Sequence, residues 1–296
     1  MDLYRYISFE EFMMLITFKS LHFVDPTKWD DSYEGCAYKM MNDTDFRNNF
    51  LSDLYDKLSE KDIFIKTAGV LSNYCHFVFT SGNWYGQCWT YLESENDALW
   101  RIYSYERKSI RIKSSVERIR KIFETKYKVY DKKVIYDNAV NREDIAKMQI
   151  EGMIEEKKTV EPFFHKRTAF SHENEYRFLI TPLADERGNA SMYPNMVGFV
   201  VKGTLHNLDL INKESPITNK EAAISAINQV IEQMVPKSIS SIADNINVNV
   251  NNVSELVQDV LINPKADNWY VMLVKKICED NGIHCSGRST LYDSVI

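Results

Sequence analysis

Apolar residues along the chain follow two spacings, one typical of helices and one typical of strands. Between Thr44 and Ser59 they recur every three to four positions, which predicts a helix over this segment. Tyr74–Thr80 is instead an unbroken apolar, β-favouring run followed by Ser-Gly-Asn, which predicts a strand and a turn. Similar extended runs predict strands at 4–7, 21–24, 109–113, 129–136, 175–180, 197–202, 246–250, 261–262 and 284–292.

Several predicted helices begin with a capping signal. Ser8 and Glu11 have capping-box spacing, because the serine can accept from the backbone of residue 11 while the glutamate reaches back, so a helix should run to about Phe18. The same signals and the apolar spacing predict helices at 97–105, 114–125, 141–157, 218–234, 254–258 and 267–280. Short strands interleaved irregularly with helices favour an α+β fold over regular parallel α/β layers.

The composition is that of an ordinary globular protein. The chain has 296 residues, of which 44% are hydrophobic and 26% are charged, and neither an internal repeat nor a Gly/Ser/Pro-rich linker divides it. We therefore expect one domain over residues 1–296. No apolar stretch is long enough for a membrane span, and the start of the chain lacks a signal-sequence pattern. We expect a cytoplasmic protein with no membrane partner.

Common cofactor and metal motifs are missing from the sequence. No predicted strand leads into GxGxxG, and neither GxxxxGK[ST] nor HExxH occurs, so Rossmann-type, P-loop and zinc-protease sites are not supported. The five cysteines show no CxxC spacing. The acidic group of Asp25, Asp30, Asp31 and Glu34 lacks an EF-hand pattern. We therefore predict no metal site.

Charge is distributed unevenly along the chain. The net charge is −6, yet residues 105–133 carry eleven Lys or Arg against four acidic residues. A local basic surface can attract phosphate even on an acidic protein, so this stretch is a candidate nucleic-acid contact. Its candidate residues are Arg111, Lys121, Lys126 and Lys128. The alternative is a solvated helix face beside a strand.

Three segments place polar side chains on or beside predicted core strands, where an unpaired charge is costly. In the first, Arg5 faces one side of a strand whose other side carries Tyr4 and Tyr6. A planar guanidinium can grip two phosphate oxygens at once, so an arginine among aromatic residues suits a phosphate group. The alternative is an edge-strand arginine paired with a carboxylate.

The second segment is the predicted helix that begins at residue 97. Trp100, Tyr103 and Ser104 lie three to four positions apart and would share one helical face. Such a face could stack a planar ring and hydrogen-bond a ribose. The alternative is that the two aromatic residues are simply part of the core.

The third segment is the predicted strand that follows His172. Glu173, Glu175 and Arg177 would project from one face of it. Two carboxylates about 6 to 7 Å apart on one face could act as an acid/base pair or hold a ribose. The alternative is a cross-strand ladder in which Arg177 is the counter-ion.

These segments resemble, in their order along the chain, a large bacterial family known as an uncharacterised domain. The resemblance spans about residues 3–292 and rests on LYRY at 3–6, LHFVDPTKWDDSYEG at 21–35, ALWRIYS at 98–104, SIRI at 109–112, HENEYRFLI at 172–180, and VLINPKADNW followed by CSGRSTLY at 285–292. The layout of that family is in turn similar to ADP-ribosyltransferases, including toxins that act inside bacteria.

This resemblance implies a split β-sheet core decorated by helices, with NAD as co-substrate and no metal. Arg5 would take the family's first-strand position, and Ser104 or Ser109 the middle one, although the usual Ser-Thr-Ser is absent there. Glu175 would be the catalytic glutamate that holds the nicotinamide ribose, and Glu173 would orient or deprotonate the acceptor. The implied NAD-binding residues are Tyr4, Arg5, Tyr6, Trp100, Tyr103, Ser104 and Arg177.

The function that we expect is therefore NAD-dependent ADP-ribosyl transfer to a nucleic acid or a protein inside a bacterial cell. A toxin or phage-defence role, with an antitoxin protein as a partner, fits the resemblance. Two alternatives stay open. The same pocket could hydrolyse NAD without transfer, or the chain could be a non-catalytic module that binds a nucleotide, a nucleic acid or a protein.

Overall fold

The three-dimensional structure is a computed structural model of the chain. It describes residues 1–80, 84–103, 107–138, 141–156, 158, 160–182, 192–234 and 243–293. Helices and strands are interleaved along the chain, and a large mixed sheet forms the centre, so the predicted α+β class is confirmed. Among the described residues, no helix is both long and apolar enough to cross a membrane.

Strand β3 (Tyr85–Thr90) is the centre of the sheet, because three strands pair with it. Strand β8 (Glu175–Pro182) runs antiparallel along its whole length and occupies one edge. Strands β1 (Asp2–Ile7) and β2 (Ser20–Val24) must therefore share the other edge, where β1 pairs only at Thr90 and β2 only at Gly86. The sheet consequently opens between β1 and β2.

The remaining strands extend this arrangement outward. On the side of β1 the strand order continues with β4, β10 and β11. Of these pairs only β10 and β11 are parallel. Strand β9 pairs with β2, and β5 pairs with β8. Strands β6 and β7 form a separate parallel pair. Their bounds are β4 Ile110–Ser115, β5 Tyr127–Lys133, β6 Ile135–Asp137, β7 His165–Arg167, β9 Asn245–Asn249, β10 Asp259–Ile262 and β11 Cys285–Arg288.

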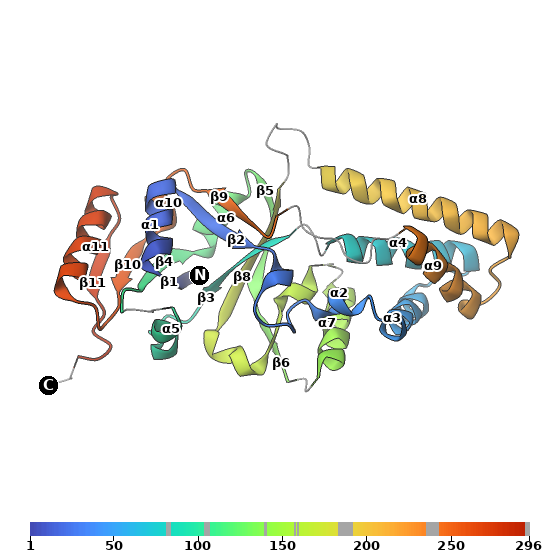
Figure 1. Cartoon of the computed structure of the whole chain (residues 1–296), viewed down its shortest axis with the longest axis horizontal. Helices are drawn as coiled ribbons and strands as arrows, with labels where there is room; N and C mark the ends of the chain where they lie inside the picture. Colours follow the sequence, from blue (N-terminus) through green and yellow to red (C-terminus); the bar gives the residue numbers. More distant parts are fainter. Residues whose placement is uncertain are drawn as a thin grey trace.

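The longer helices gather at one end of the molecule. In Figure 1, α3, α4, α8 and α9 lie together on one side of the sheet, whereas α11 lies at the opposite end. The helices are α1 Phe9–Phe18, α2 Cys36–Met40, α3 Thr44–Lys57, α4 Ile63–Thr80, α5 Asp97–Ile102, α6 Val116–Phe123, α7 Arg142–Glu156, α8 Met192–Glu214, α9 Lys220–Met234, α10 Val253–Leu256 and α11 Asn268–Asp280. Three 3-10 helices cover Pro26–Lys28, Glu161–Phe164 and Thr168–Glu173.

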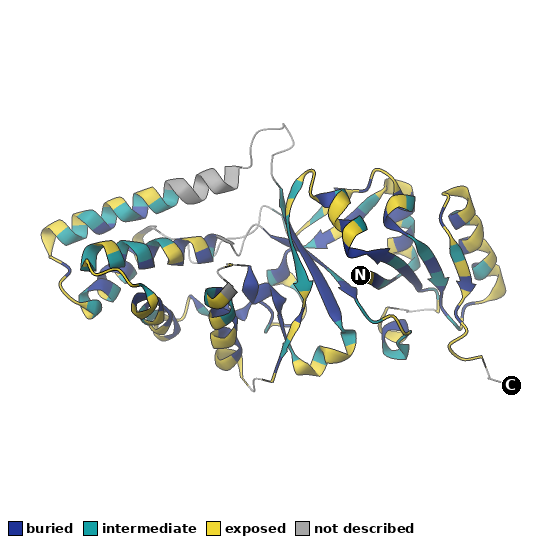
Figure 2. Ribbon diagram, turned by 180° about the vertical axis from the view of Figure 1, so that it is seen from behind, coloured by how far each residue is buried: buried dark blue, intermediate teal, exposed yellow. Residues whose placement is uncertain are grey.

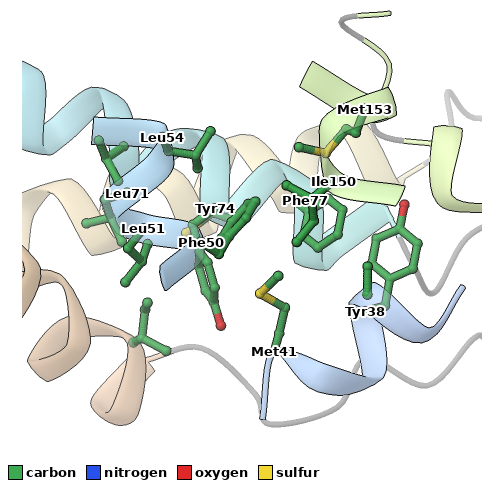
Figure 3. Close-up of a cluster of buried hydrophobic side chains, with 14 of the residues drawn as sticks. Tyr38, Met41, Phe50, Leu51, Leu54, Leu71, Tyr74, Phe77, Ile150 and Met153 are labelled. Atoms are coloured by element: carbon green, nitrogen blue, oxygen red, sulfur yellow. The ribbon is translucent and has the colours of Figure 1, made fainter. Parts of the chain in front are cut away.

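The molecule has two main hydrophobic clusters, one among the helices and one on the sheet. One lies among the helices, where Phe50 and Phe77 pack with their ring centroids 5.3 Å apart (Figure 3). The other lies on the sheet and includes Phe12, Phe23 and Phe178, all fully buried. Burial in Figure 2 is accordingly concentrated in the central strands, whereas the outer faces of the helices are exposed.

The capping signals identified two of the four predicted helix caps correctly and missed the other two by one residue. Ser8 accepts from the backbone of Glu11, and the Glu11 carboxylate accepts from the backbone of Ser8, so the predicted capping box opens α1. Asn141 caps α7 by accepting from the backbone of Asp144. The cap of α6 is Ser115 and not the predicted Ser114, because the strand before it continues to Ser115. The cap of α9 is Asn219 and not the predicted Thr218, because the Asn219 side chain accepts from the backbone of Ala222.

The strand predicted at Tyr74–Thr80 is wrong, because this segment is the last part of helix α4. Tyr74, Cys75, Phe77 and Phe79 are all buried in the cluster among the helices. A helix that is buried on more than one side has no polar stripe, so its apolar run resembles that of a buried strand.

Two further elements differ from the predictions, helix α8 and strand β3. The strand predicted at 197–202 is wrong, because these residues lie inside α8. Strand β3 was not predicted, since Gly86, Gln87 and Cys88 interrupt the apolar pattern that identifies strands. The polar Gln87 is nevertheless buried, and its amide donates to the carbonyl of His22 at 3.0 Å.

Candidate active site

A cavity of about 570 Å³ lies at the opening of the sheet. It is lined by residues of β1, β2, β3 and α5, of the 29–34 loop, of β7 and of the start of β8. Three of its lining residues, Tyr4, Arg5 and Tyr6, belong to the first strand of the chain. The divergence of β1 and β2 thus creates a pocket in the middle of a continuous sheet.

The cavity brings together residues that are far apart in sequence. Arg5 on β1, Tyr103 after α5, and Glu173, Glu175 and Arg177 at β8 all line it. Arg5 and Glu175 are separated by about 170 positions in the chain. The predicted first-strand arginine and the predicted glutamate pair therefore share one pocket.

Glu173 and Glu175 reach the cavity by a different backbone path from the one predicted. Glu173 ends a 3-10 helix, and β8 begins only at Glu175. Between them Asn174 adopts a left-handed conformation with φ 46°, which asparagine tolerates better than most residues. A turn at Asn174, and not strand alternation, brings the two carboxylates to one side.

Arg177 anchors the floor of the cavity and is completely buried. Its Nε and Nη2 donate to Glu175 Oε2 at 2.9 and 2.6 Å, and Nη2 also donates to Glu34 Oε1 at 3.0 Å. Nη1 donates to the carbonyl of Phe163 at 2.7 Å, and the Trp29 ring lies 4.4 Å from the guanidinium carbon. A buried charge with this many partners is fixed in one geometry.

Lys166 on β7 contacts the same carboxylates as Arg177 and also Glu173. Its Nζ donates to Glu173 Oε2 at 2.5 Å and to Glu175 Oε1 at 3.1 Å, and lies 3.3 Å from Glu34 Oε1. Three carboxylates therefore surround two cations. With every group ionised, the cluster carries one excess negative charge, which favours either an added proton or a cationic ligand.

The two site carboxyl groups differ in proton affinity. Burial raises the pKa of Glu173, the neighbouring Glu175 charge raises it further, and together they outweigh Lys166 and bring it to about 7. Burial also acts to raise the pKa of Glu175, but Arg177 and Lys166 outweigh it and hold that pKa well below its usual range. Glu175 is therefore ionised at neutral pH, and Glu173 can exchange a proton near neutrality.

Arg5 contacts the neighbouring helix α1 through Glu11. Its Nη2 lies 3.4 Å from Glu11 Oε1, and its side chain is 21% exposed. The guanidinium has five N–H donors, so a single long contact to Glu11 leaves most of them able to bind an anion in the cavity. This contact is the predicted alternative of an arginine paired with a carboxylate, but it does not remove Arg5 from the pocket.

The segment from Trp100 to Ser109, which was predicted to bind the ribose and a planar ring, contributes fewer residues to the cavity than predicted. Tyr103 lines it and is 43% exposed. Trp100 is buried behind Tyr6, with ring centroids 4.8 Å apart, and donates to Glu95 Oε2 at 2.9 Å. Ser104 lies outside the described residues. Ser109 is buried and accepts from Asn263 at 2.9 Å, and it is not among the residues that line the cavity.

The predicted nucleic-acid residues fall into two groups. Arg111 is buried, with its guanidinium 3.8 Å from the Tyr4 ring centroid, and it donates to the carbonyls of Leu92 and Glu93. Lys121, Lys126 and Lys128 are exposed.

These exposed lysines lie at a distance from the candidate catalytic residues. Lys128 pairs with Thr181 on β8, six residues beyond Glu175. At the usual rise along a strand, this places Lys128 about 20 Å from Glu175. A nucleic acid bound at the lysines would have to extend along the sheet to reach the cavity.

Several site residues were not predicted from the sequence. Glu34 and Lys166 complete the charge cluster, and Trp29 covers Arg177. Gly86 permits this cover, because a Cβ at that position would lie 2.4 Å from Trp29 Cζ2. The acidic group that includes Asp30, Asp31 and Glu34 is visible in the sequence, but its pattern does not indicate which cations these side chains contact.

Two acidic residues of the 29–34 loop, Asp31 and Glu34, pair with arginines. Asp31 accepts two hydrogen bonds from Arg167, at 2.9 and 3.1 Å, and Glu34 accepts from Arg177. Within the described part of the chain, no group of three or more acidic, histidine or cysteine side chains has an arrangement that could hold a metal ion.

Comparison with known proteins adds a partial family match. Residues 99–178 match the model of a family described as a protein of unknown function, DUF2971. The matched part runs from α5 to β8 and includes Tyr103, Lys166, Glu173, Glu175 and Arg177. No curated protein and no solved structure matches the chain.

Proposed function

We propose that this protein is an NAD-dependent ADP-ribosyltransferase that modifies a nucleic acid or a protein inside a bacterial cell. The observation that supports this function best is the meeting of Arg5, Tyr103 and the Glu173/Glu175 pair in one cavity at the opening of the sheet. Arg5, Glu173 and Glu175 are the residues at which the sequence resembles that class of enzyme. Their separation in the chain makes a chance cluster of this composition a poor explanation.

The reaction would use Glu175 as a fixed negative charge. Breaking the bond between the ribose C1′ and the nicotinamide nitrogen sends the bonding electrons to nicotinamide and leaves positive charge on the ribose. A carboxylate held in place by Arg177 and Lys166 is already oriented toward such a charge and needs no reorganisation. The lowered pKa of Glu175 keeps it anionic at neutral pH.

Glu173 would act as the general base that takes a proton from the acceptor. As the acceptor's lone pair forms the new bond to C1′, its proton must leave, and a carboxylate with a pKa of about 7 can take it. Glu173 is also more accessible than Glu175, with side-chain exposures of 17% and 9%. The more exposed group is therefore the one suited to meet an incoming molecule.

The remaining groups would position NAD. Arg5 has donors for the pyrophosphate, and the half-exposed Tyr103 ring offers a flat surface at the cavity wall. Trp100 would act indirectly, by supporting Tyr6 from behind. A toxin or phage-defence role would require that the open cavity be inhibited in the producing cell, which an antitoxin covering it would achieve.

The proposal can be tested with NAD labelled on the adenine ring and a bacterial lysate. Wild-type protein should transfer label, Glu175→Gln should not, and Glu143→Gln should match wild type, since Glu143 is an exposed partner of Lys147. Protease or nuclease treatment would then identify the acceptor class. Nicotinamide release without labelling would indicate NAD hydrolysis instead. Intact NAD and no NAD binding by calorimetry would leave the non-catalytic binding module.

A further inference from the structure

Two cysteines meet between helix α11 and strand β11, which lie side by side (Figure 1). Cys278 lies in the last turn of α11 and is fully buried, whereas Cys285 begins β11 and is half-buried. In the short turn between them, Gly282 adopts a left-handed conformation with φ 64°, and the backbone N–H of Ile283 donates to the Cys278 carbonyl at 2.9 Å. The chain thereby reverses, and the two thiols form a side-chain hydrogen bond with each other.

Strand β11 is irregular next to Cys285. Consecutive residues of β10 pair with Cys285 and Gly287, so Ser286 is an extra residue in the ladder. Asp259 accepts from the Ser286 backbone at 3.0 Å and from its hydroxyl at 2.9 Å, and these bonds hold the bulge in place. Gly287 has a φ of 94°, and its backbone N–H donates to the Cys285 sulfur. The bulge therefore places a hydrogen-bond donor on this thiol.

A lysine of α11 lies close to the same part of β11. A Cβ on Gly287 would lie 3.2 Å from Lys275 Cε and 3.4 Å from its Nζ, so glycine at this position lets the ammonium approach the strand. The Lys275 charge and the Gly287 N–H both favour a thiolate on Cys285. The hydrogen bond from Cys278 has the largest effect. With these two groups it outweighs burial and the nearby Asp259 carboxylate, and the pKa of Cys285 falls to about 7.

The other cysteines have the opposite character. Burial raises the pKa of Cys36 and Cys75 to about 11, and that of Cys88 to about 12. The pKa of Cys278 also lies above its ordinary value, because its thiol donates to Cys285 and is buried. Since the thiolate is the nucleophilic form of cysteine, Cys285 is the one cysteine of the five that is suited to react near neutral pH.

We propose that Cys285 and Cys278 are a redox-active pair that reacts with peroxides, in which Cys285 attacks the oxidant and Cys278 closes a disulfide. The Cys285 thiolate forms an S–O bond to one peroxide oxygen as the O–O bond breaks. The other oxygen takes a proton from solvent and leaves as water or an alcohol, so Cys285 becomes a sulfenic acid. The Cys278 sulfur then forms the S–S bond, the S–O bond breaks, and the Cys278 proton leaves with the hydroxyl as water. One peroxide is reduced, and two thiols are oxidised.

The positions of the two thiols suit these different parts. Cys285 is half-buried and borders solvent, so an oxidant can reach it, whereas Cys278 is enclosed and protected from direct attack. Cys278 also already contacts the sulfur that it must attack. A thiol in contact captures the sulfenic acid before further peroxide converts it irreversibly to a sulfinic acid. This arrangement makes the disulfide the expected product.

Peptide mapping after oxidation tests the pair and does not depend on the proposed enzymatic function. Trypsin cuts after Lys276 and Arg288 but not between them, so one peptide carries both cysteines. Without peroxide this peptide should take an alkyl group on each cysteine. After hydrogen peroxide it should take none and should lack two hydrogen atoms, while the other three cysteines stay alkylatable. A peptide that is still fully alkylated after excess peroxide would overturn the proposal, and one that gains oxygen would contradict the part of Cys278.

Two cysteine variants separate the attacking thiol from the resolving thiol. Cys278→Ser should stop at the sulfenic acid, which a 1,3-dione reagent would trap on Cys285. Cys285→Ser should leave Cys278 as a free thiol after the same treatment. Circular dichroism should show the wild-type fold in both. Oxidation of Cys278 in the Cys285→Ser variant, at the rate of the wild-type pair, would reverse the assignment.

The reactivity of Cys285 can also be measured without an oxidant. Iodoacetamide at neutral pH should alkylate Cys285 in the folded wild type at least about tenfold faster than Cys88. Lys275→Gln should slow this alkylation about threefold at about pH 6, because it removes a charge that favours the thiolate. Lys276→Gln is the matched control, since Lys276 is an exposed neighbour that pairs with Asp280. Alkylation of Cys285 no faster than that of Cys88 would overturn the proposal.

Discussion

Lys166 Nζ lies 3.1 Å from Glu175 Oε1, although the two residues belong to different sheets. Lys166 is on β7 of the small two-stranded sheet, and Glu175 begins β8 of the large one. The contact therefore connects the two sheets at the cavity wall. It also makes the charge of Glu175 dependent on a segment that the sequence did not identify as part of the site.

Lys166→Met should lower nicotinamide release by about a hundredfold. The substitution removes one of two cations beside Glu175 and the only lysine that contacts Glu173 among the described residues, so both carboxyl groups become easier to protonate. Initial rates at saturating NAD would measure the effect, and thermal unfolding would show whether the fold persists. Lys147→Met is the matched control, because that lysine is 53% exposed on α7. Equal rates for Lys166→Met and wild type would remove Lys166 from the site.

The transfer rate should rise with pH and level off above about 7. Glu173 must be ionised to accept a proton, and its pKa is raised to about 7, so the active form is scarce below that pH and dominant above it. Below the pKa, each pH unit should change the rate about tenfold. Rates of wild type and Glu173→Gln between pH 5 and 9 would check this. A wild-type profile that falls through the same range, or one that Glu173→Gln leaves unchanged, would contradict the role of Glu173 as a base.

Local sequence signals predicted the parts of the site that depend on neighbouring residues. The Ser8–Glu11 capping box is local, and it fixes the helix that follows the strand carrying Arg5. The Glu-x-Glu-x-Arg pattern is also local, and it identified three cavity residues although Glu173 reaches the cavity through the turn at Asn174. In both cases the information lies within a few positions of the chain.

The parts that sequence did not predict depend on pairing between distant segments. Glu34 and Lys166 join Glu175 only because the 29–34 loop and β7 pack against β8, and no spacing along the chain encodes that contact. The helix at Tyr74 was missed for a similar reason, since burial on several sides removed its polar stripe. The basic stretch predicted that Arg111 would bind phosphate, but its side chain is buried and packs on the Tyr4 ring.

Gly86→Ala should destabilise the protein by about 1 to 3 kcal/mol. The added Cβ would lie 2.4 Å from Trp29 Cζ2 and 3.1 Å from Leu179 Cδ2, so the indole must move away from Arg177. Urea unfolding would measure the change. Gly69→Ala on α4 is the control, because its Cβ meets only the Leu58 side chain at 3.3 Å and alanine favours a helix. If Gly86→Ala were as stable as Gly69→Ala, the close packing of Trp29 over β3 would be refuted.

Arg5→Ala should raise the dissociation constant for NAD by about tenfold to a hundredfold, because it removes charge-assisted hydrogen bonds to the pyrophosphate. The rate from the bound complex should change much less, since the part proposed for Arg5 is to bind the pyrophosphate and not to stabilise the charge that develops on the ribose. Calorimetry would give the affinity, and saturating NAD the rate. Arg101→Ala is the control, since Arg101 is an exposed partner of Asp97.

Glu11→Gln should act in the opposite direction on the same binding equilibrium. Glu11 competes with NAD phosphates for Arg5, and its carboxylate also closes the capping box of α1. Glutamine can still accept from the backbone of Ser8, so the helix cap survives while the negative charge is lost. NAD should therefore bind about twofold to threefold more tightly at low salt, and the difference should shrink as salt screens the charge. Weaker binding by Glu11→Gln would show that Glu11 holds Arg5 in its binding position, and would reverse the part that we assign to this ion pair.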